Sequence, residues 1–195
     1  MIGYTVFSLS DLIQRIGEQD AQNILSSFVC KTDEDLETYI SERAIKYETS
    51  EKGKTFLLFD SSILEEHKEF RIIAYYTLGL TAIDLHEMSD KKKKKIVGDF
   101  PERTRRTTFP AFLIGQLGRD DRYSHNDISG EVILNEAYST LKDAALILGG
   151  KLVVLECKPH MYDKVYHDLG YHKMSDELND HGYYMLYKRV SFSEL

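Results

Sequence analysis

The stretch that decides the fold runs from Phe112 to Tyr171 and reads FLIGQLGRDDRYSHNDISGEVILNEAYSTLKDAALILGGKLVVLECKPHMYDKVYHDLGY. Its apolar pattern predicts two strands and two helices, with the strands over 108–118 and 152–156 and the helices over 129–148 and about 160–169. Gly149-Gly150 ends the long helix, because glycine readily adopts the left-handed conformation after a helix. A strand that leads into a helix N-terminus is a favourable place for an anion.

The flanking sequence extends this unit on both sides. It predicts short helices before Cys30, a helix over about 33–45, strands over 54–60 and 70–84 joined by a polar turn at 61–68, a short capped helix over 89–97, and strands near 171–174 and 182–189. The element order predicts a mixed α/β (α+β) fold, whose central sheet is partly antiparallel and partly parallel. Since no linker or repeat is visible, we expect a single domain over 1–195.

Composition excludes several classes of protein. The 195 residues are 42% hydrophobic and 29% charged, with a formal net charge of -7, as in an ordinary globular domain. No apolar run approaches the ~20 residues that span a bilayer, and no signal peptide is visible, so we expect a cytoplasmic protein without a membrane partner. Cys30 and Cys157 lie beside apolar stretches without metal-ligand spacing, which predicts buried, reduced thiols and no bound metal.

Positive charge concentrates in one segment of this acidic chain. It contains the run Lys91–Lys95 and then Arg103, Arg105 and Arg106. Such a run is usually a solvated surface, and the acidic net charge disfavours broad nucleic-acid binding. Nucleic acid is therefore not the expected partner, and contact with phosphate groups, such as those of tRNA, through 91–106 is the alternative.

The motifs together resemble one superfamily. The element order, the strand, turn and long helix, LVVLEC at 152–157 and VYHDLGY at 165–171 are similar to GNAT N-acetyltransferases, which use acetyl-CoA, and to a subgroup of uncharacterised bacterial members. The resemblance covers about 24–189. It implies a GNAT-like central mixed sheet with a splayed parallel strand pair, flanked by helices, with 1–50 as a helical N-terminal part and 85–108 as a basic insertion.

The resemblance also implies where acetyl-CoA would bind. The end of the first motif strand would hold the pantetheine arm through Leu117, Gly118 and Arg119, and the turn and helix start would hold the diphosphate through Asn126, Asp127, Ile128, Ser129, Gly130 and Glu131. Arg119 and Arg122 could add contacts to phosphate. The loop departs from the superfamily's glycine-rich pattern, because only Gly130 remains. From the residues alone, an ordinary loop with Asp127 or Ser129 as N-cap is the alternative.

Tyr166 is the candidate catalytic residue. By resemblance it is the acid that protonates the departing CoA thiolate, and a phenol and a thiolate have similar basicity. The alternative is a core role, because Tyr162, Val165, Tyr166 and Leu169 form a stripe at helical spacing. No general base is evident from the sequence, and Glu156, His160 and His86 are the candidates.

Two functions follow from these observations. The first is an acetyl-CoA-dependent N-acetyltransferase that moves the acetyl group to a primary amine by direct attack on the thioester. The second is a non-catalytic GNAT-fold protein that binds CoA or a macromolecular partner, as a regulator or a mobile-element or toxin-type factor. The acidic charge slightly favours a cationic amine as acceptor. A homodimer is one assembly that the chain could form.

Overall fold

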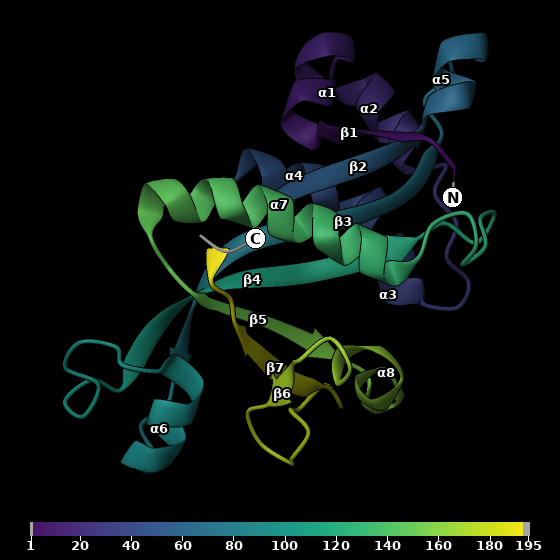
Figure 1. Cartoon of the computed structure of the whole chain (residues 1–195). Helices are drawn as coiled ribbons and strands as arrows, with labels where there is room; N and C mark the ends of the chain where they lie inside the picture. The colour runs from purple at the N-terminus through teal and green to yellow at the C-terminus, as the bar shows by residue number, and fades with distance from the viewer. Residues whose placement is uncertain (1, 193–195) are drawn as a thin grey trace. The chain divides into compact units, whose positions relative to one another are not determined.

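The computed structural model describes residues 2–192, and its strands form a seven-stranded sheet in the order β1-β2-β3-β4-β5-β7-β6 (Figure 1). β4 (Thr108–Arg119) and β5 (Leu152–Cys157) run parallel, with Phe112 opposite Val153 and Ile114 opposite Leu155. The pairs β1–β2, β2–β3, β5–β7 and β6–β7 are antiparallel. The mixed sheet with flanking helices that the sequence predicts is therefore confirmed.

The chain divides into two compact units. The first contains the residues up to Gly79 together with Gly115–Thr140, and the second contains Leu80–Ile114 together with the residues from Leu141 onward. β3 (Ile72–Asp84), β4 and α7 (Gly130–Leu148) each contribute residues to both units. The single domain over 1–195 stays a prediction.

The first unit combines antiparallel strands with the N-terminal helices. β2 (Lys54–Asp60) lies between β1 (Tyr4–Ser8) and β3. Figure 1 shows α1 beside β1 and β2, with α2 next to it. The helical segments are α1 (Leu9–Ile16), α2 (Glu18–Leu25), α3 (Glu34–Thr38), the π-helical turn η1 (Tyr39–Arg43), α4 (Ala44–Thr49) and α5 (Ser61–His67).

Aromatic rings fill the core of this unit. Tyr75 of β3 packs edge-on against Phe28 and is stacked on Tyr39, with ring centroids 5.2 and 6.2 Å away. The Tyr75 hydroxyl donates a 2.7 Å hydrogen bond to the Leu36 carbonyl, so its polar end is satisfied although the side chain is fully buried. Burial raises the pKa of Tyr75, so the phenol stays neutral and anchors α3 to the sheet.

Two elements of this unit differ from the sequence prediction. Residues 61–68 are helical in α5 and not a polar turn, because Asp60 caps the helix by accepting the N–H groups of Ser62 and Ile63. Its residues lack an apolar stripe, which is why the pattern did not predict a helix. β1 was also not predicted, and it pairs along β2 from Tyr4 opposite Asp60 to Ser8 opposite Phe56.

One buried hydroxyl in this unit gives a stability prediction. Thr55 is 0% exposed, and among residues 2–192 no group lies within hydrogen-bond geometry of its Oγ1, although the Tyr39 phenol is near. The change Thr55→Val keeps the shape and removes an unsatisfied polar atom, so we expect the free energy of unfolding to rise by about 1 kcal/mol. Urea denaturation measures this, and a loss of stability would show that the hydroxyl has a partner, such as water.

The second unit is built on β5 and its neighbours. β7 (Tyr184–Arg189) pairs with β5 on one edge and with the short β6 (His172–Lys173) on the other. Ile96 of α6 (Asp90–Val97), Phe109 of β4 and Tyr187 of β7 belong to its hydrophobic core. After β5 the chain forms one turn of helix, α8 (Pro159–Met161), and then the π-helical turn η2 (Tyr162–Tyr166).

The long helix α7 follows its predicted range closely. The apolar side chains along one face of α7 are buried at Leu134, Ala137, Tyr138 and Leu141, whereas Leu148 at its end is 67% exposed. Gly149 and Gly150 follow with φ of 74° and 112°, which L side chains rarely adopt. A Cβ on Gly150 would also lie 2.7 Å from the Phe112 ring, so glycine is needed there for both reasons.

Two further sequence expectations can be compared with the structure. Cys30 and Cys157 are both buried free thiols, as predicted. Among the helices of residues 2–192, none is both long and apolar enough to cross a membrane.

Candidate functional site

A buried carboxylate holds the loop that joins β4 to α7, residues 120–129, hereafter the 120–129 loop. Asp120 is 0% exposed and accepts hydrogen bonds from the Val29 N–H, from the Arg122 N–H and from the Arg122 guanidinium at 2.7 and 2.8 Å. Arg122 also donates to the Ser27 carbonyl. The Arg122 guanidinium, which the sequence suggested as a phosphate contact, is therefore bound to Asp120. The hydrogen bond to Asp120 raises the pKa of Arg122.

The far end of the 120–129 loop is ordered by Asp127. Its Oδ2 accepts the backbone N–H and the hydroxyl of Ser124, both at 2.7 Å, and these hydrogen bonds lower the pKa of Asp127. The Asp127 carbonyl accepts the N–H of Ile2. Arg119 closes the loop by donating from Nη1 to the Ile128 carbonyl at 2.9 Å. The carboxylate is thus turned back onto Ser124.

The N-terminus of α7 follows directly. The Ser129 hydroxyl accepts the Val132 N–H at 3.2 Å, and the Ser129 carbonyl accepts the Ile133 N–H, so Ser129 is the N-cap. Among the described residues, the N–H groups of Gly130 and Glu131 have no such partner, as expected in the first turn of a helix. These N–H groups and the helix dipole favour an anion at this point.

The end of β4 is closely packed against the helices of its own unit. A Cβ on Gly118 would lie 3.0 Å from Leu36 Cδ1 and 3.3 Å from the Tyr75 ring, so only glycine fits without movement of its neighbours. Glycine at position 118 therefore allows β4 to approach Leu36 and Tyr75 closely. The predicted role of these residues in holding pantetheine stays a prediction.

Tyr166 lies in the second unit, as the last residue of η2. Its ring packs edge-on against the buried Tyr171, with centroids 5.5 Å apart, and its carbonyl accepts the Tyr171 N–H at 3.0 Å. Gly170, with φ of 79°, turns the chain between them. Tyr166 is only half-buried, so it is not a fully enclosed core residue. Its catalytic role stays a prediction.

The candidate bases differ in how well they are held. Glu156, at the end of β5, is exposed and accepts a 2.9 Å hydrogen bond from the Asn179 amide. Asn179 in turn accepts the N–H groups of His181 and Tyr183, so a small turn orients this carboxylate. His86 is exposed and lies 3.1 Å from Asp84, within its own turn. His160, the third candidate, is exposed in α8. Glu156 is the best oriented of the three, and Asn179, which orients it, was not predicted from the sequence.

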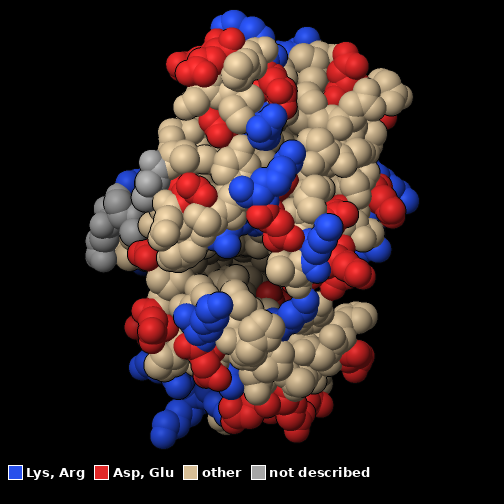
Figure 2. All heavy atoms as spheres, turned by 90° about the vertical axis from the view of Figure 1, so that its right-hand side faces the viewer, with Lys and Arg blue, Asp and Glu red and all other residues tan. Residues whose placement is uncertain are grey.

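Positive and negative side chains are mixed over the face that Figure 2 shows. Among the residues of the basic segment, Lys93 is buried at 7% exposure, and its ammonium lies 3.5 Å from the Arg106 carbonyl. Arg103 donates to the Gly98 carbonyl at 2.9 Å, and Lys94 lies 3.8 Å from Asp99. Several cations of the basic segment therefore interact with groups of their own unit.

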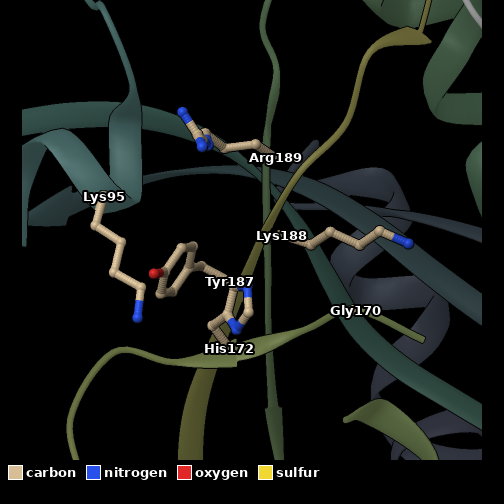
Figure 3. A pocket seen from close by; sticks show the side chains of 6 residues that line it. All are labelled: Lys95, Gly170, His172, Tyr187, Lys188 and Arg189. Carbon is tan, nitrogen blue, oxygen red and sulfur yellow. The ribbon is translucent and has the colours of Figure 1, made fainter. Parts of the chain in front are cut away.

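A basic pocket of about 270 Å³ lies in the second unit (Figure 3). Its lining contains cationic and hydrogen-bonding side chains and no carboxylate, and it consists of Lys95, Gly170, His172, Tyr187, Lys188 and Arg189. Figure 3 shows Lys95 extending from α6 toward Tyr187, whereas Lys188 points to the other side of β7. Lys188 donates to the Leu169 carbonyl at 2.7 Å, and burial lowers its pKa. This pocket is suited to an anionic group.

No group of three or more metal-ligating side chains that could hold a metal ion occurs within residues 2–192.

Comparison with known sequences and with known structures gives different results. No protein-family model and no curated protein sequence matches the chain.

Solved structures match it over nearly its whole length. A Tyr-to-Phe variant of KacT superposes with a TM-score of 0.70 at 14% identity, covering 98% of both chains. AtaTR bound with acetyl-CoA also gives 0.70, at 18% identity, covering 98% of this chain and 96% of that one. AtaT complexed with acetyl-methionyl-tRNAfMet gives 0.68 at 18% identity, covering 98% of both chains. The chain therefore has a GNAT-like fold, which it shares with the toxin AtaT and with KacT.

The structure thus brings together one part of the predicted site. Arg119, Asp127, Ile128, Ser129 and Gly130 lie in one hydrogen-bonded loop and helix start of the first unit. Tyr166 belongs to the second unit, and the roles of all these residues stay predictions.

Proposed function

We propose that the chain is an acetyl-CoA-dependent N-acetyltransferase that transfers the acetyl group to a primary amine. The observation that carries the proposal is the likeness of fold, over 98% of the chain, to AtaTR bound with acetyl-CoA. The geometry of the 120–129 loop supports it, because the carboxylate that would repel a diphosphate is bonded to Ser124.

The diphosphate of acetyl-CoA would bind at the start of α7. The N–H groups of Gly130 and Glu131 are the donors, and the helix dipole adds a partial positive charge. The loop needs few glycines for this purpose, because its shape is fixed by the hydrogen bonds of Asp120, Asp127 and Arg119. A glycine-poor loop that is ordered beforehand loses little conformational entropy when the ligand binds.

The backbone at the end of β4 would hold the pantetheine arm and the thioester. Leu117, Gly118 and Arg119 supply N–H and C=O groups of fixed position, since Gly118 is packed against Leu36 and Tyr75. A backbone N–H aimed at the thioester oxygen would stabilise the oxyanion that develops during attack.

The reaction would then need one proton donor and one proton acceptor. The amine nitrogen attacks the thioester carbon, the C–S bond breaks, and the sulfur leaves as a thiolate. Tyr166 donates its phenolic proton to that thiolate, and the nitrogen of the new amide loses a proton. Glu156, oriented by Asn179, is the candidate to accept the second proton directly or through a water molecule.

We propose the amino group of an aminoacyl-tRNA as the acceptor. AtaT, whose fold this chain shares, has been solved with acetyl-methionyl-tRNAfMet. The basic pocket of the second unit, with Lys95 and Arg189 in its lining, gives this acidic chain a local place for a phosphate group. The net charge of -7 repels tRNA at long range. Salt screens this repulsion beyond about 8–10 Å, so the nearby cations of the pocket can still attract a phosphate group.

Acetyl-CoA binding separates this proposal from a protein that does not use the cofactor. A ligand at about 100 times its dissociation constant adds about 2.7 kcal/mol to the free energy of unfolding. We therefore expect millimolar acetyl-CoA to raise the melting temperature clearly, with adenosine as the control that lacks the diphosphate. An unchanged melting temperature with acetyl-CoA would exclude the proposed activity.

A further inference from the structure

An unusual hydrogen bond joins β3 and β4 within the first unit. The Gln116 N–H donates to the side-chain Oγ1 of Thr77 at 2.8 Å. Nearby, the Asp120 N–H donates to the Ile73 carbonyl at 2.9 Å, as in an ordinary antiparallel ladder. Asp120 lies four residues after Gln116, and Ile73 lies four residues before Thr77. If that register continued, Gln116 would donate to the Thr77 carbonyl. The acceptor at this position is instead the side-chain hydroxyl of Thr77.

Gly115 provides the room for this hydroxyl. A Cβ at Gly115 would lie 2.9 Å from Thr77 Oγ1, a distance that real Cβ atoms essentially never show. Gly115 itself is exposed, and glycine inside a strand often marks a close approach of another group. The Thr77 hydroxyl can therefore occupy its position only because Gly115 has no Cβ.

The Thr77 hydroxyl is buried, which favours its hydrogen bond with the Gln116 N–H. Thr77 is 5% exposed, so its Oγ1 has little access to water. Its cross-strand partner is Thr55, and the Tyr39 phenol lies beside both threonines. A backbone N–H that is partly shielded from water loses stabilisation when its acceptor is removed, so the Gln116 N–H depends on Thr77.

We propose that Thr77 is a positioning residue that sets the backbone of β4 where acetyl-CoA binds. The Gln116 N–H is bonded to Thr77, and Gly118 has no room for a Cβ beside Leu36 and Tyr75, so Leu117 lies between two constrained positions. This inference rests on the proposed function, in which Leu117–Arg119 hold the pantetheine arm. The hydrogen bond to the Thr77 hydroxyl therefore helps to set where the N–H and C=O groups of Leu117–Arg119 lie.

Paired substitutions test the hydroxyl itself. Thr77→Val keeps the shape and removes the acceptor, and we expect the dissociation constant for acetyl-CoA to rise about fivefold or more, the effect of one lost hydrogen bond. Thr77→Ser keeps the acceptor and should restore binding to within about twofold of the original chain. Thr55→Val makes the same change at the cross-strand partner and should leave acetyl-CoA binding unchanged. Isothermal titration calorimetry on the full chain measures all of these.

Gly115 gives a second test that does not depend on Thr77→Val folding. Gly115→Ala should weaken acetyl-CoA binding in the original chain, because the new methyl group pushes on Thr77 Oγ1. The same change in a Thr77→Ala background should have a much smaller effect, since the clashing atom is gone. An equal effect in both backgrounds would overturn the proposed pairing.

The outcomes separate this inference from the proposed function. If the original chain binds no acetyl-CoA, the proposed function fails and Thr77 has no cofactor to position. If the original chain binds acetyl-CoA and Thr77→Val binds it equally well, the proposed function stands and the inference is wrong. A loss of stability in Thr77→Val that Thr77→Ser does not share, with acetyl-CoA binding unchanged, would likewise assign Thr77 a purely structural role.

Discussion

Replacing Tyr166 by phenylalanine is expected to lower the turnover number for acetyl transfer about 10²- to 10⁴-fold, the usual contribution of a general acid. The substitution removes the proton that the CoA thiolate would receive, but it keeps the ring that packs on Tyr171. The dissociation constant for acetyl-CoA should therefore stay nearly unchanged. Steady-state kinetics and calorimetry on the same preparation measure the two quantities.

Tyr162 provides the matched control, because it lies at the other end of the same π-helical turn. Its ring packs edge-on against His167 and lies under the Lys173 ammonium, and phenylalanine can make both contacts. Tyr162→Phe should keep turnover within a few-fold of the original chain. If Tyr166→Phe instead abolishes acetyl-CoA binding or lowers the melting temperature, Tyr166 is a packing residue and the proposed acid is wrong.

Asp120→Ala should have the largest effect on stability. It removes the acceptor of four hydrogen bonds, from Val29, from the Arg122 backbone and from two guanidinium nitrogens of Arg122. Loss of one partner of a buried ion pair costs about 3–5 kcal/mol, and we expect about 3 kcal/mol here because the Arg122 side chain is 42% exposed and can reach water. The melting temperature should fall by about 6–12 °C.

The neighbouring Asp121 is the control for this prediction. Its exposed carboxylate accepts the Lys31 N–H at 2.7 Å and lies 3.4 Å from the Thr32 hydroxyl. Asp121→Ala should cost only about 1 kcal/mol, the net value of an ordinary hydrogen bond. If Asp120→Ala and Asp121→Ala lower the free energy of unfolding equally, Asp120 does not hold the 120–129 loop as described.

The elements with strong periodicity were predictable from the sequence. The stripe Leu134, Ala137 and Leu141, together with Gly149-Gly150, placed α7 within one residue of its observed start and at its observed end. The apolar runs of β2 and β5 were equally clear. α5 was missed because its cap, Asp60, precedes a helix with no apolar stripe, and β1 because five residues carry too little pattern.

The site was predictable only where it depends on residue type along the chain. The resemblance to GNAT enzymes, rather than a local pattern, assigns the diphosphate to Asn126–Glu131, and this assignment stays a prediction. The contacts that shape it come from residues distant in sequence, such as Asp120 with Val29 and Gln116 with Thr77, which no local pattern reveals. Arg122 illustrates the difference, because an arginine in a loop suggests phosphate, whereas its guanidinium is bound to Asp120.

Acetyl transfer to aminoacyl-tRNA tests the central claim most directly. The full chain would be incubated with radiolabelled acetyl-CoA and a mixture of charged tRNAs, with uncharged tRNA and a polyamine as parallel acceptors. We predict label on the charged tRNA, lost on deacylation, together with stoichiometric release of CoA thiol and little label on uncharged tRNA. Label on the polyamine alone would keep the acetyltransferase and change its acceptor, whereas no label and no thiol release with any amine would contradict the proposed function.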